Sequence, residues 1–221
     1  MTTFHVITLF PGAFDSYLGE SILKRAIEDK KIRVKLYNPR DFAKNKWHRV
    51  DQRPYGGGPG MVIEALPVMK AIDKALQGSR RKRKGGRKAR IAFFSPSGKQ
   101  FTNAMADSFA GDEDIVLVCG RYEGIDARVK KAFPMAEVSV GPYTLTGGEL
   151  PAMVMIDAIS RRIPGVLGHE GSIEETRIAS PDVYTRPEAI EFKGKKHRVP
   201  KVLLSGDRAR IDSWKLGKKR S

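Results

Sequence analysis

The chain has 221 residues, one cysteine and a formal net charge of +16 at pH 7. A single cysteine excludes a disulfide framework and fits a reducing compartment, and no apolar run reaches the roughly 18 residues of a membrane span. The first ten residues also lack the basic leader and cleavage site of a signal peptide. We therefore expect a cytoplasmic protein without a membrane anchor.

Two segments carry the positive charge. Residues 79–90 contain eight Lys or Arg and no acid, and residues 193–220 contain eleven Lys or Arg against two Asp, a net of +9. The rest of the chain is then nearly neutral, at −1. Such clustering favours a polyanionic partner, RNA or DNA before membrane. The alternative is a loop and a tail that only improve solubility.

The apolar pattern alternates between strand-like and helix-like segments along the first three quarters of the chain. Strands are predicted at residues 4–10, 32–36, 91–94, 115–119 and 138–140. Helices are predicted at residues 21–31, 66–76, 102–109 and 151–163, with Thr102 or Asn103 as the cap of the third. This order predicts an α/β fold with a mostly parallel sheet and helices outside it.

The chain is predicted to contain a main domain and a small second one. We assign residues 1–165 to the main domain, with 79–90 as a basic insert, and residues 166–183 to a polar linker. Residues 184–221 form a basic, mostly helical C-terminal region that is smaller than the ~60 residues that usually fold alone. We therefore expect it to dock on the main domain or on a second subunit.

Glycine-bearing loops follow three of the predicted strands, at residues 95–98, 120–126 and 139–151. Ligands of parallel sheets bind where strands end, and glycine lets the backbone approach a ligand closely. A fourth loop, residues 51–60, places Asp, Arg and Tyr among four glycines and resembles a binding loop. Tight turns and a flexible linker are the plainer interpretations of these loops.

Several common sites are absent from the sequence. There is no P-loop, no G-x-G-x-x-G, no CxxC and no HExxH, and the four histidines are scattered, so we expect no metal site. Cys119 lies in an apolar run and is predicted to belong to the core. Three loops converging through backbone groups would suit a ligand with many polar edges, such as an adenosine.

Motifs spread over nearly the whole chain carry a family resemblance. They are residues 7–11, 38–42, 51–61, 118–126, 145–153, 163–168 and 184–187. By the order and the amino-acid sequences of these motifs, the chain resembles the bacterial tRNA (guanine-N1)-methyltransferases, the TrmD family of the knotted SPOUT superfamily.

The resemblance implies a deep trefoil knot, S-adenosylmethionine bound in it, and an obligate homodimer whose active sites lie between subunits. The implied product is 1-methylguanosine immediately 3′ of the anticodon of tRNA. The implied cofactor-binding residues are Phe94, Ser95, Pro96, Gly120, Tyr122, Glu123, Gly124, Ser139, Val140, Gly141, Pro142, Tyr143, Thr144, Leu145, Gly147, Gly148 and Pro151. The implied substrate-binding residues are Asp51, Arg53, Tyr55, Pro59, Gly60 and Arg186.

Two catalytic roles follow from the resemblance. A carboxylate accepts the proton of guanine N1, and an arginine, Arg161 by position in the family pattern, stabilises the charge that develops on O6. In the family, the general base that accepts this proton is an Asp in the linker, but no Asp matches that position in this chain. For the base we choose Glu175 first and Glu174 second. The plainer alternatives are that these glutamates are only solvated acids of the linker and that Arg161 only complements the dipole at the C-terminus of its helix. A requirement for Mg²⁺ stays open.

Two competing functions remain at this stage. One is a non-catalytic RNA-binding protein, against which the intact cofactor loops argue. The other is a knotted methyltransferase that acts on another atom, such as a ribose 2′-oxygen, against which the glycine loop at residues 51–60 argues. For the basic insert at residues 79–90 we expect non-specific binding of RNA phosphates.

Overall fold

The computed structural model describes residues 1–80, 89–168 and 182–218 of the chain. Most of the basic insert at residues 79–90 therefore lies outside the described residues, and Glu174 and Glu175 of the linker lie wholly outside them. The chain divides into two compact units, Met1–Leu167 and Gly168–Ser221.

The first unit is built on a five-stranded sheet in the order β2-β1-β6-β5-β7, in which every neighbouring pair is parallel. Its strands are β1 (Thr2–Ile7), β2 (Ile32–Tyr37), β5 (Arg90–Gln100), β6 (Asp114–Val118) and β7 (Ala136–Ser139). The prediction of an α/β fold with a mostly parallel sheet is confirmed. Strands of a parallel sheet are buried on both faces and so appear as continuous apolar runs.

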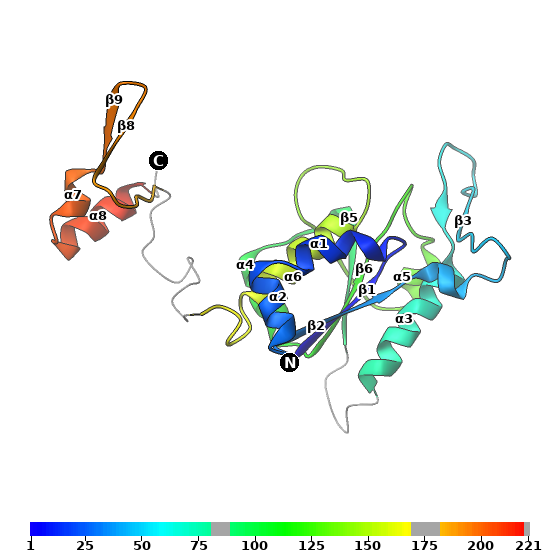
Figure 1. The fold of residues 1–221 in the computed structure, drawn as a ribbon. Helices are drawn as coiled ribbons and strands as arrows, with labels where there is room; N and C mark the ends of the chain where they lie inside the picture. The colour runs from blue at the N-terminus through cyan, green and yellow to red at the C-terminus, as the bar shows by residue number, and fades with distance from the viewer. Residues whose placement is uncertain (81–88, 169–181, 219–221) are drawn as a thin grey trace. The chain divides into compact units, whose positions relative to one another are not determined.

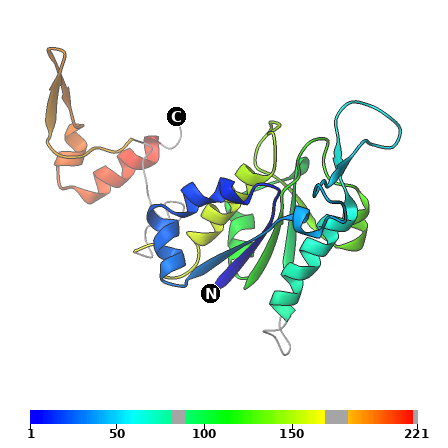
Figure 2. The same ribbon diagram turned by 45° about the vertical axis from the view of Figure 1, so that its right-hand side comes forward.

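Helices cover both faces of the sheet (Figures 1 and 2). On one face lie α1 (Asp15–Leu18), α2 (Ser21–Glu28), α4 (Asn103–Ala110) and α6 (Glu149–Ser160), and on the other α3 (Ala65–Arg80) and α5 (Arg128–Ala132). Short 3-10 turns, η1 (Pro11–Phe14) and η2 (Pro39–Phe42), follow β1 and β2. Alternate residues of one strand serve the two cores: in β6, Leu117 packs with α6, whereas Val116 and Val118 pack with α3.

The loop predicted at residues 95–98 is part of strand β5, which runs on to Gln100. Phe94 and Lys99 both pair with Val138 of β7, so residues 95–98 bulge out of the pairing between them. Gly98 permits this, because a Cβ there would lie 2.6 Å from the backbone nitrogen of Val138. The predicted cap is confirmed, since the Thr102 hydroxyl oxygen accepts from the Met105 N–H at 3.3 Å.

The stretch predicted as irregular, residues 38–60, contains more order than expected. Besides η2 it includes β3 (Asp51–Gln52), which pairs antiparallel with β4 (Val62–Ile63). The glycine loop therefore connects the two strands of a small antiparallel ribbon, and their pairing fixes both ends of the loop.

The second unit has a hairpin that the prediction of a mostly helical region left out. It consists of β8 (Ala189–Phe192) and β9 (Lys195–Arg198), followed by α7 (Lys201–Leu204) and α8 (Arg208–Lys218). The hairpin turns at Lys193 and Gly194, whose φ angles are +50° and +71°, as a two-residue turn of this type requires. Its side chains are almost all exposed, so no alternation of apolar and polar residues marks it.

Candidate active site

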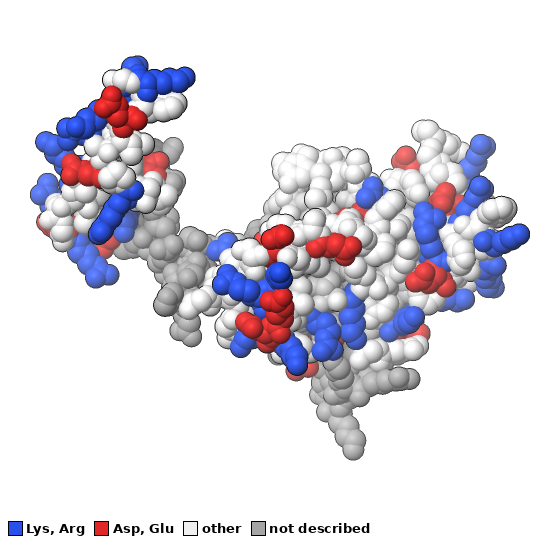
Figure 3. Space-filling view, in the orientation of Figure 1, with Lys and Arg blue, Asp and Glu red and all other residues white. Residues whose placement is uncertain are grey.

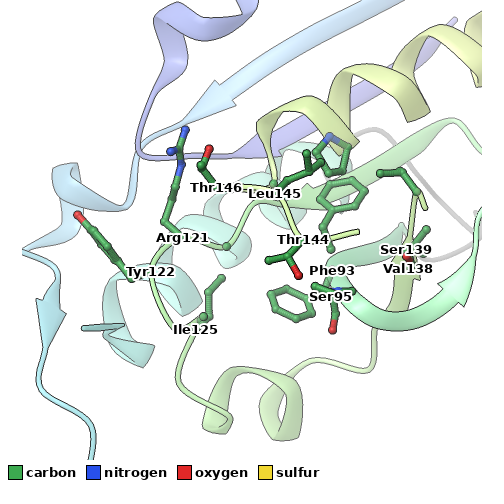
Figure 4. Close-up of a pocket in the computed structure, with 18 of the residues that line it drawn as sticks. Phe93, Ser95, Arg121, Tyr122, Ile125, Val138, Ser139, Thr144, Leu145 and Thr146 are labelled. Carbon is green, nitrogen blue, oxygen red and sulfur yellow. The ribbon is translucent and has the colours of Figure 1, made fainter. Parts of the chain in front are cut away.

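A pocket of about 400 Å³ opens at the carboxyl ends of β5, β6 and β7 in the first unit (Figure 4). Three chain segments form most of its wall, together with one lysine from α5. The lining residues are Phe93, Phe94, Ser95, Pro96, Gly120, Arg121, Tyr122, Glu123, Gly124, Ile125, Lys130, Val138, Ser139, Val140, Gly141, Tyr143, Thr144, Leu145, Thr146, Gly147, Gly148 and Pro151.

The structure brings nearly all of the expected cofactor residues together at this pocket. The exception is Pro142, which is exposed and is not among the lining residues. Six lining residues were missed by sequence reasoning: Phe93, Arg121, Ile125, Lys130, Val138 and Thr146. Of these, Arg121 and Ile125 lie within the glycine motif at residues 120–126, so their position was available from the sequence.

Two of the loops are joined directly by their backbones. The Gly148 N–H donates to the Gly120 carbonyl at 2.9 Å, and Arg121 forms an antiparallel bridge with Gly147. A Cβ on Gly148 would lie 2.6 Å from the Cα of Cys119. This approach is possible only for glycine, which explains a glycine pair at residues 147–148.

A buried carboxylate ties the same loops to the first strand. Glu149, at the start of α6, is only 3% exposed. It accepts from the Thr8 hydroxyl at 2.8 Å and from Arg121 Nε at 2.9 Å, and the Arg121 guanidinium lies 4.4 Å from the centre of the Phe10 ring. A buried carboxylate is tolerated when it is paired and hydrogen-bonded, so this network fixes one wall of the pocket.

The side chain of Cys119 lies behind this wall. It is buried, and burial, followed by the charge of Glu149, raises the pKa of its thiol well above its usual value. Such a thiol is a poor nucleophile, and the prediction of a core cysteine is confirmed.

The glycine loop at residues 51–60 adjoins the pocket. The Glu123 N–H donates to the Met61 carbonyl at 3.0 Å, and the Ile63 N–H donates to the Gly124 carbonyl at 3.0 Å. A Cβ on Gly60 would lie 2.5 Å from a carboxylate oxygen of Glu123. Of the expected substrate residues, Asp51 is half-buried in β3, whereas Arg53, Tyr55, Pro59 and Gly60 are exposed on this loop. Arg186 is exposed in the second unit.

The structure does not place Arg161 at the pocket. Gly148 and Pro151 line the pocket at the N-terminal end of α6, whereas Arg161 is the residue that follows the other end. Twelve helical residues at 1.5 Å each separate the two ends by about 18 Å. Glu175, the expected base, lies outside the described residues.

Neither a metal cluster nor a membrane helix is found in the described part of the chain. No group of three His, Cys, Asp or Glu there could hold a metal ion. Likewise, none of the helices described combines the length and the apolar character needed to cross a membrane.

Comparison with known proteins agrees with this arrangement. A family profile described as "tRNA (Guanine-1)-methyltransferase TrmD" matches residues 2–221. A tRNA (guanine-N(1)-)-methyltransferase of Clostridioides difficile is 44% identical over 216 residues, which cover 96% of this chain and 90% of the relative. One of Geotalea uraniireducens is 45% identical over 216 residues, 96% of this chain and 83% of the relative.

A solved structure shows the same fold. The crystal structure of tRNA (m1G37) methyltransferase from Aquifex aeolicus superimposes with a TM-score of 0.79 at 36% identity and covers 99% of this chain and 89% of that one. The chain therefore belongs to the TrmD family of S-adenosylmethionine-dependent tRNA (guanine-N1)-methyltransferases.

Proposed function

We propose that the protein transfers a methyl group from S-adenosylmethionine to N1 of the guanosine immediately 3′ of the anticodon in tRNA. The observation that carries the proposal is the pocket of glycine turns, beside which hydrogen bonds of Met61 and Ile63 to Glu123 and Gly124 hold the end of the 51–60 loop. Membership of the family supports guanine N1 as the target, and the m1G37 activity named for the Aquifex aeolicus protein supports the position in tRNA.

The residues of the pocket fit the proposed cofactor. Phe93, Ile125 and Leu145 offer apolar surface for an adenine ring, and the backbone of the glycine turns offers donors and acceptors for its polar edges. Glu123 adds a carboxylate that favours a cationic sulfonium. When bound, the cofactor supplies an electrophilic methyl group. We further propose that the segments of these turns are threaded as a trefoil knot, which the backbone contacts between residues 120–121 and 147–148 support.

The protein's own groups must activate guanine N1, which carries a proton and is a poor nucleophile. We assign the role of base to the Glu175 carboxylate, with Glu174 as second choice. General base catalysis of this kind typically accelerates a reaction by about 10²–10⁴-fold. Arg161 would stabilise the negative charge that develops on O6, and Asp51 on the glycine loop would hold the guanine edge.

The position of Arg161 supports a homodimer with shared sites. Leu150, Val154, Asp157 and Arg161 follow one another at helical spacing, so they share one face of α6. Leu150 and Val154 are 58% and 48% exposed, an apolar surface that a second copy would cover. Antiparallel packing of two such helices across a two-fold axis would bring each Arg161 to the pocket end of the other helix.

The basic segments supply the remaining contacts with tRNA. We propose that residues 184–221 bind the tRNA substrate and that residues 79–90 bind its phosphates non-specifically. In this reading tRNA is the main partner, the reaction occurs in the cytoplasm, and Mg²⁺, if required, acts on the RNA or the site from solution.

The proposal is tested by incubating the protein with tRNA transcripts and methyl-labelled cofactor and identifying the modified nucleoside by mass spectrometry. We expect 1-methylguanosine from a transcript with guanosine 3′ of the anticodon and none from a transcript with adenosine there. A 2′-O-methylated product, or label in both transcripts, would refute it. Single-turnover rates of Glu175→Gln and Glu174→Gln then decide the base, since only the true base should show a large loss.

A further inference from the structure

An exposed tryptophan projects from the segment between η2 and β3, on the side of the first unit away from α6. Trp47 is 73% exposed, although it is among the side chains that gain most from leaving water. Its immediate neighbours, residues 44–46 and 48–49, are exposed as well, whereas Val50 is fully buried and anchors the segment. A large aromatic ring held in solvent is a candidate contact surface.

The segment is a built turn rather than a loose loop. Asn45 Oδ1 accepts from the N–H groups of Trp47 at 3.1 Å and Arg49 at 2.9 Å, and Asn45 Nδ2 donates to the Arg49 carbonyl at 2.7 Å. Arg40 donates to the His48 carbonyl at 3.3 Å, and His48 Nδ1 lies 3.0 Å from the Arg40 carbonyl oxygen. The backbone therefore fixes the exposure of the Trp47 ring.

Positive charge surrounds the ring. Lys44, Lys46 and Arg49 are exposed on the same turn, and Lys46 Nζ lies 5.8 Å from the centre of the Trp47 ring. Lys and Arg side chains gather at the right-hand edge of Figure 3, where Figure 1 places this part of the chain. Cations around an apolar ring complement a nucleobase with its phosphates better than they complement an apolar protein surface.

The turn is fixed to the same frame as the pocket. Asp51 follows Trp47 by four residues, a span of at most ~14 Å when extended, and pairs in β3 with Ile63 of β4. Ile63 in turn donates to the carbonyl of Gly124, which lines the pocket. A nucleotide bound at this turn would be a near neighbour of one bound at the glycine loop.

We propose that Trp47 is a stacking platform for an unpaired base of the RNA substrate close to the target guanosine, with Lys44, Lys46 and Arg49 binding the adjoining phosphates. Bases stack on aromatic side chains with little regard to sequence, so the platform orients the RNA without adding sequence preference. The inference rests on the proposed tRNA substrate.

Binding of tRNA by full-length variants tests the platform. Trp47→Ala is expected to raise the Kd for tRNA by about 5- to 150-fold, the range for losing one base stack, and Trp47→Phe to restore most of it. The affinity for S-adenosylhomocysteine is the internal control, because the ring is not among the pocket-lining residues. Wild-type affinity of Trp47→Ala for tRNA would overturn the platform, as would a change in its oligomeric state, which would make Trp47 an interface residue.

Fluorescence separates stacking from simple charge attraction. The chain has two tryptophans, so Trp214→Phe leaves Trp47 as the only one. We expect tRNA to quench its emission and heparin, a polyanion without bases, to leave it unchanged; equal quenching by both would overturn the inference. If the wild-type protein methylates tRNA and Trp47→Ala binds tRNA as tightly as wild type, only the platform is refuted. If the wild-type protein does not methylate tRNA, the proposed function itself is refuted.

Discussion

Substitution of Gly148 by alanine tests whether the close approach of two loops shapes the pocket. Its φ and ψ of −83° and −2° are accessible to alanine, so the backbone itself would not be strained. The added Cβ, however, would lie 2.6 Å from the Cα of Cys119 and 3.0 Å from the backbone nitrogen of Gly120. Carbon atoms pack at about 3.5–4.0 Å, so the loops must separate by roughly 1 Å.

The expected magnitude follows from the rigidity of these neighbours. Both are backbone atoms, and the 2.9 Å hydrogen bond between the Gly148 N–H and the Gly120 carbonyl must lengthen when they move. Overpacking by one methyl group typically costs about 1–3 kcal/mol. This outweighs the gain of about 0.4–1 kcal/mol from the less flexible unfolded chain. Because Gly120 and Gly148 both line the pocket, cofactor binding should weaken as well.

Gly78 supplies a matched control, because it lies in α3 with nothing within 4 Å of an added Cβ. There, alanine should stabilise the protein by about 0.5–1 kcal/mol. Urea unfolding gives the two free energies, and calorimetry with S-adenosylhomocysteine gives the affinities. The reasoning fails if Gly148→Ala is as stable as Gly78→Ala and binds the ligand as tightly as wild type.

Three further predictions concern other parts of the unit. Thr8→Val keeps the volume but leaves an oxygen of Glu149 without its 2.8 Å donor, so urea unfolding should show a loss of about 1–3 kcal/mol; no loss would deny the network a structural role. If sites are shared, Arg161→Ala and Gly148→Ala subunits refolded together should give about a quarter of wild-type methylation at a cofactor concentration too low for Gly148→Ala, since half of the two-fold dimers are mixed and each has one intact site; no recovery would refute shared sites. Hydrogen bonds from Arg128, first of all from its guanidinium, lower the pKa of Asp126 below its ordinary value of 3.8. Its stabilising effect is therefore present above that value and lost as the pH falls through the lowered pKa, so the melting temperatures of wild type and Asp126→Asn should converge as the pH falls below 3.8, and a constant difference would contradict this.

The parallel sheet was predictable because burial on both faces leaves an unambiguous record in the sequence. Residues 115–118 of β6 are apolar without interruption and fully buried. The loop at Ser95–Pro96–Ser97–Gly98 was predictable from its turn-like composition, and these residues do leave the pairing with β7. The continuation of β5 to Gln100 was not predictable, because Lys99 and Gln100 are polar and only their pairing with β7 makes them a strand.

The glycine turns identified the pocket, but the side chains that hold it together were not apparent. Thr8, Arg121 and Glu149 are far apart in sequence and meet only because β1 and β6 are adjacent in the sheet. The local sequence around each of these polar residues does not indicate which distant residue it will bind. The resemblance supplied Arg161 as a catalytic residue and implied sites between subunits; the structure adds that Arg161 follows the end of α6 away from the pocket.

Cofactor binding and dimer formation should be coupled, because they share the first turn of α6. In consecutive positions, Glu149 fixes the loops, Leu150 presents 58% of its surface to solvent on the proposed dimer face, and Pro151 lines the pocket. A charge at Leu150 should therefore both separate the subunits and weaken the binding of S-adenosylhomocysteine, by about 5-fold or more for a typical coupling.

The matched control for Leu150→Glu is Leu66→Glu, since Leu66 is a 48% exposed leucine in the first turn of α3. Ultracentrifugation and calorimetry on the same samples give oligomeric state and affinity. Linkage requires reciprocity, so ligand should also shift Leu150→Glu back toward the dimer. A monomeric Leu150→Glu that binds the ligand like wild type would refute the coupling and show that the pocket is complete within one subunit.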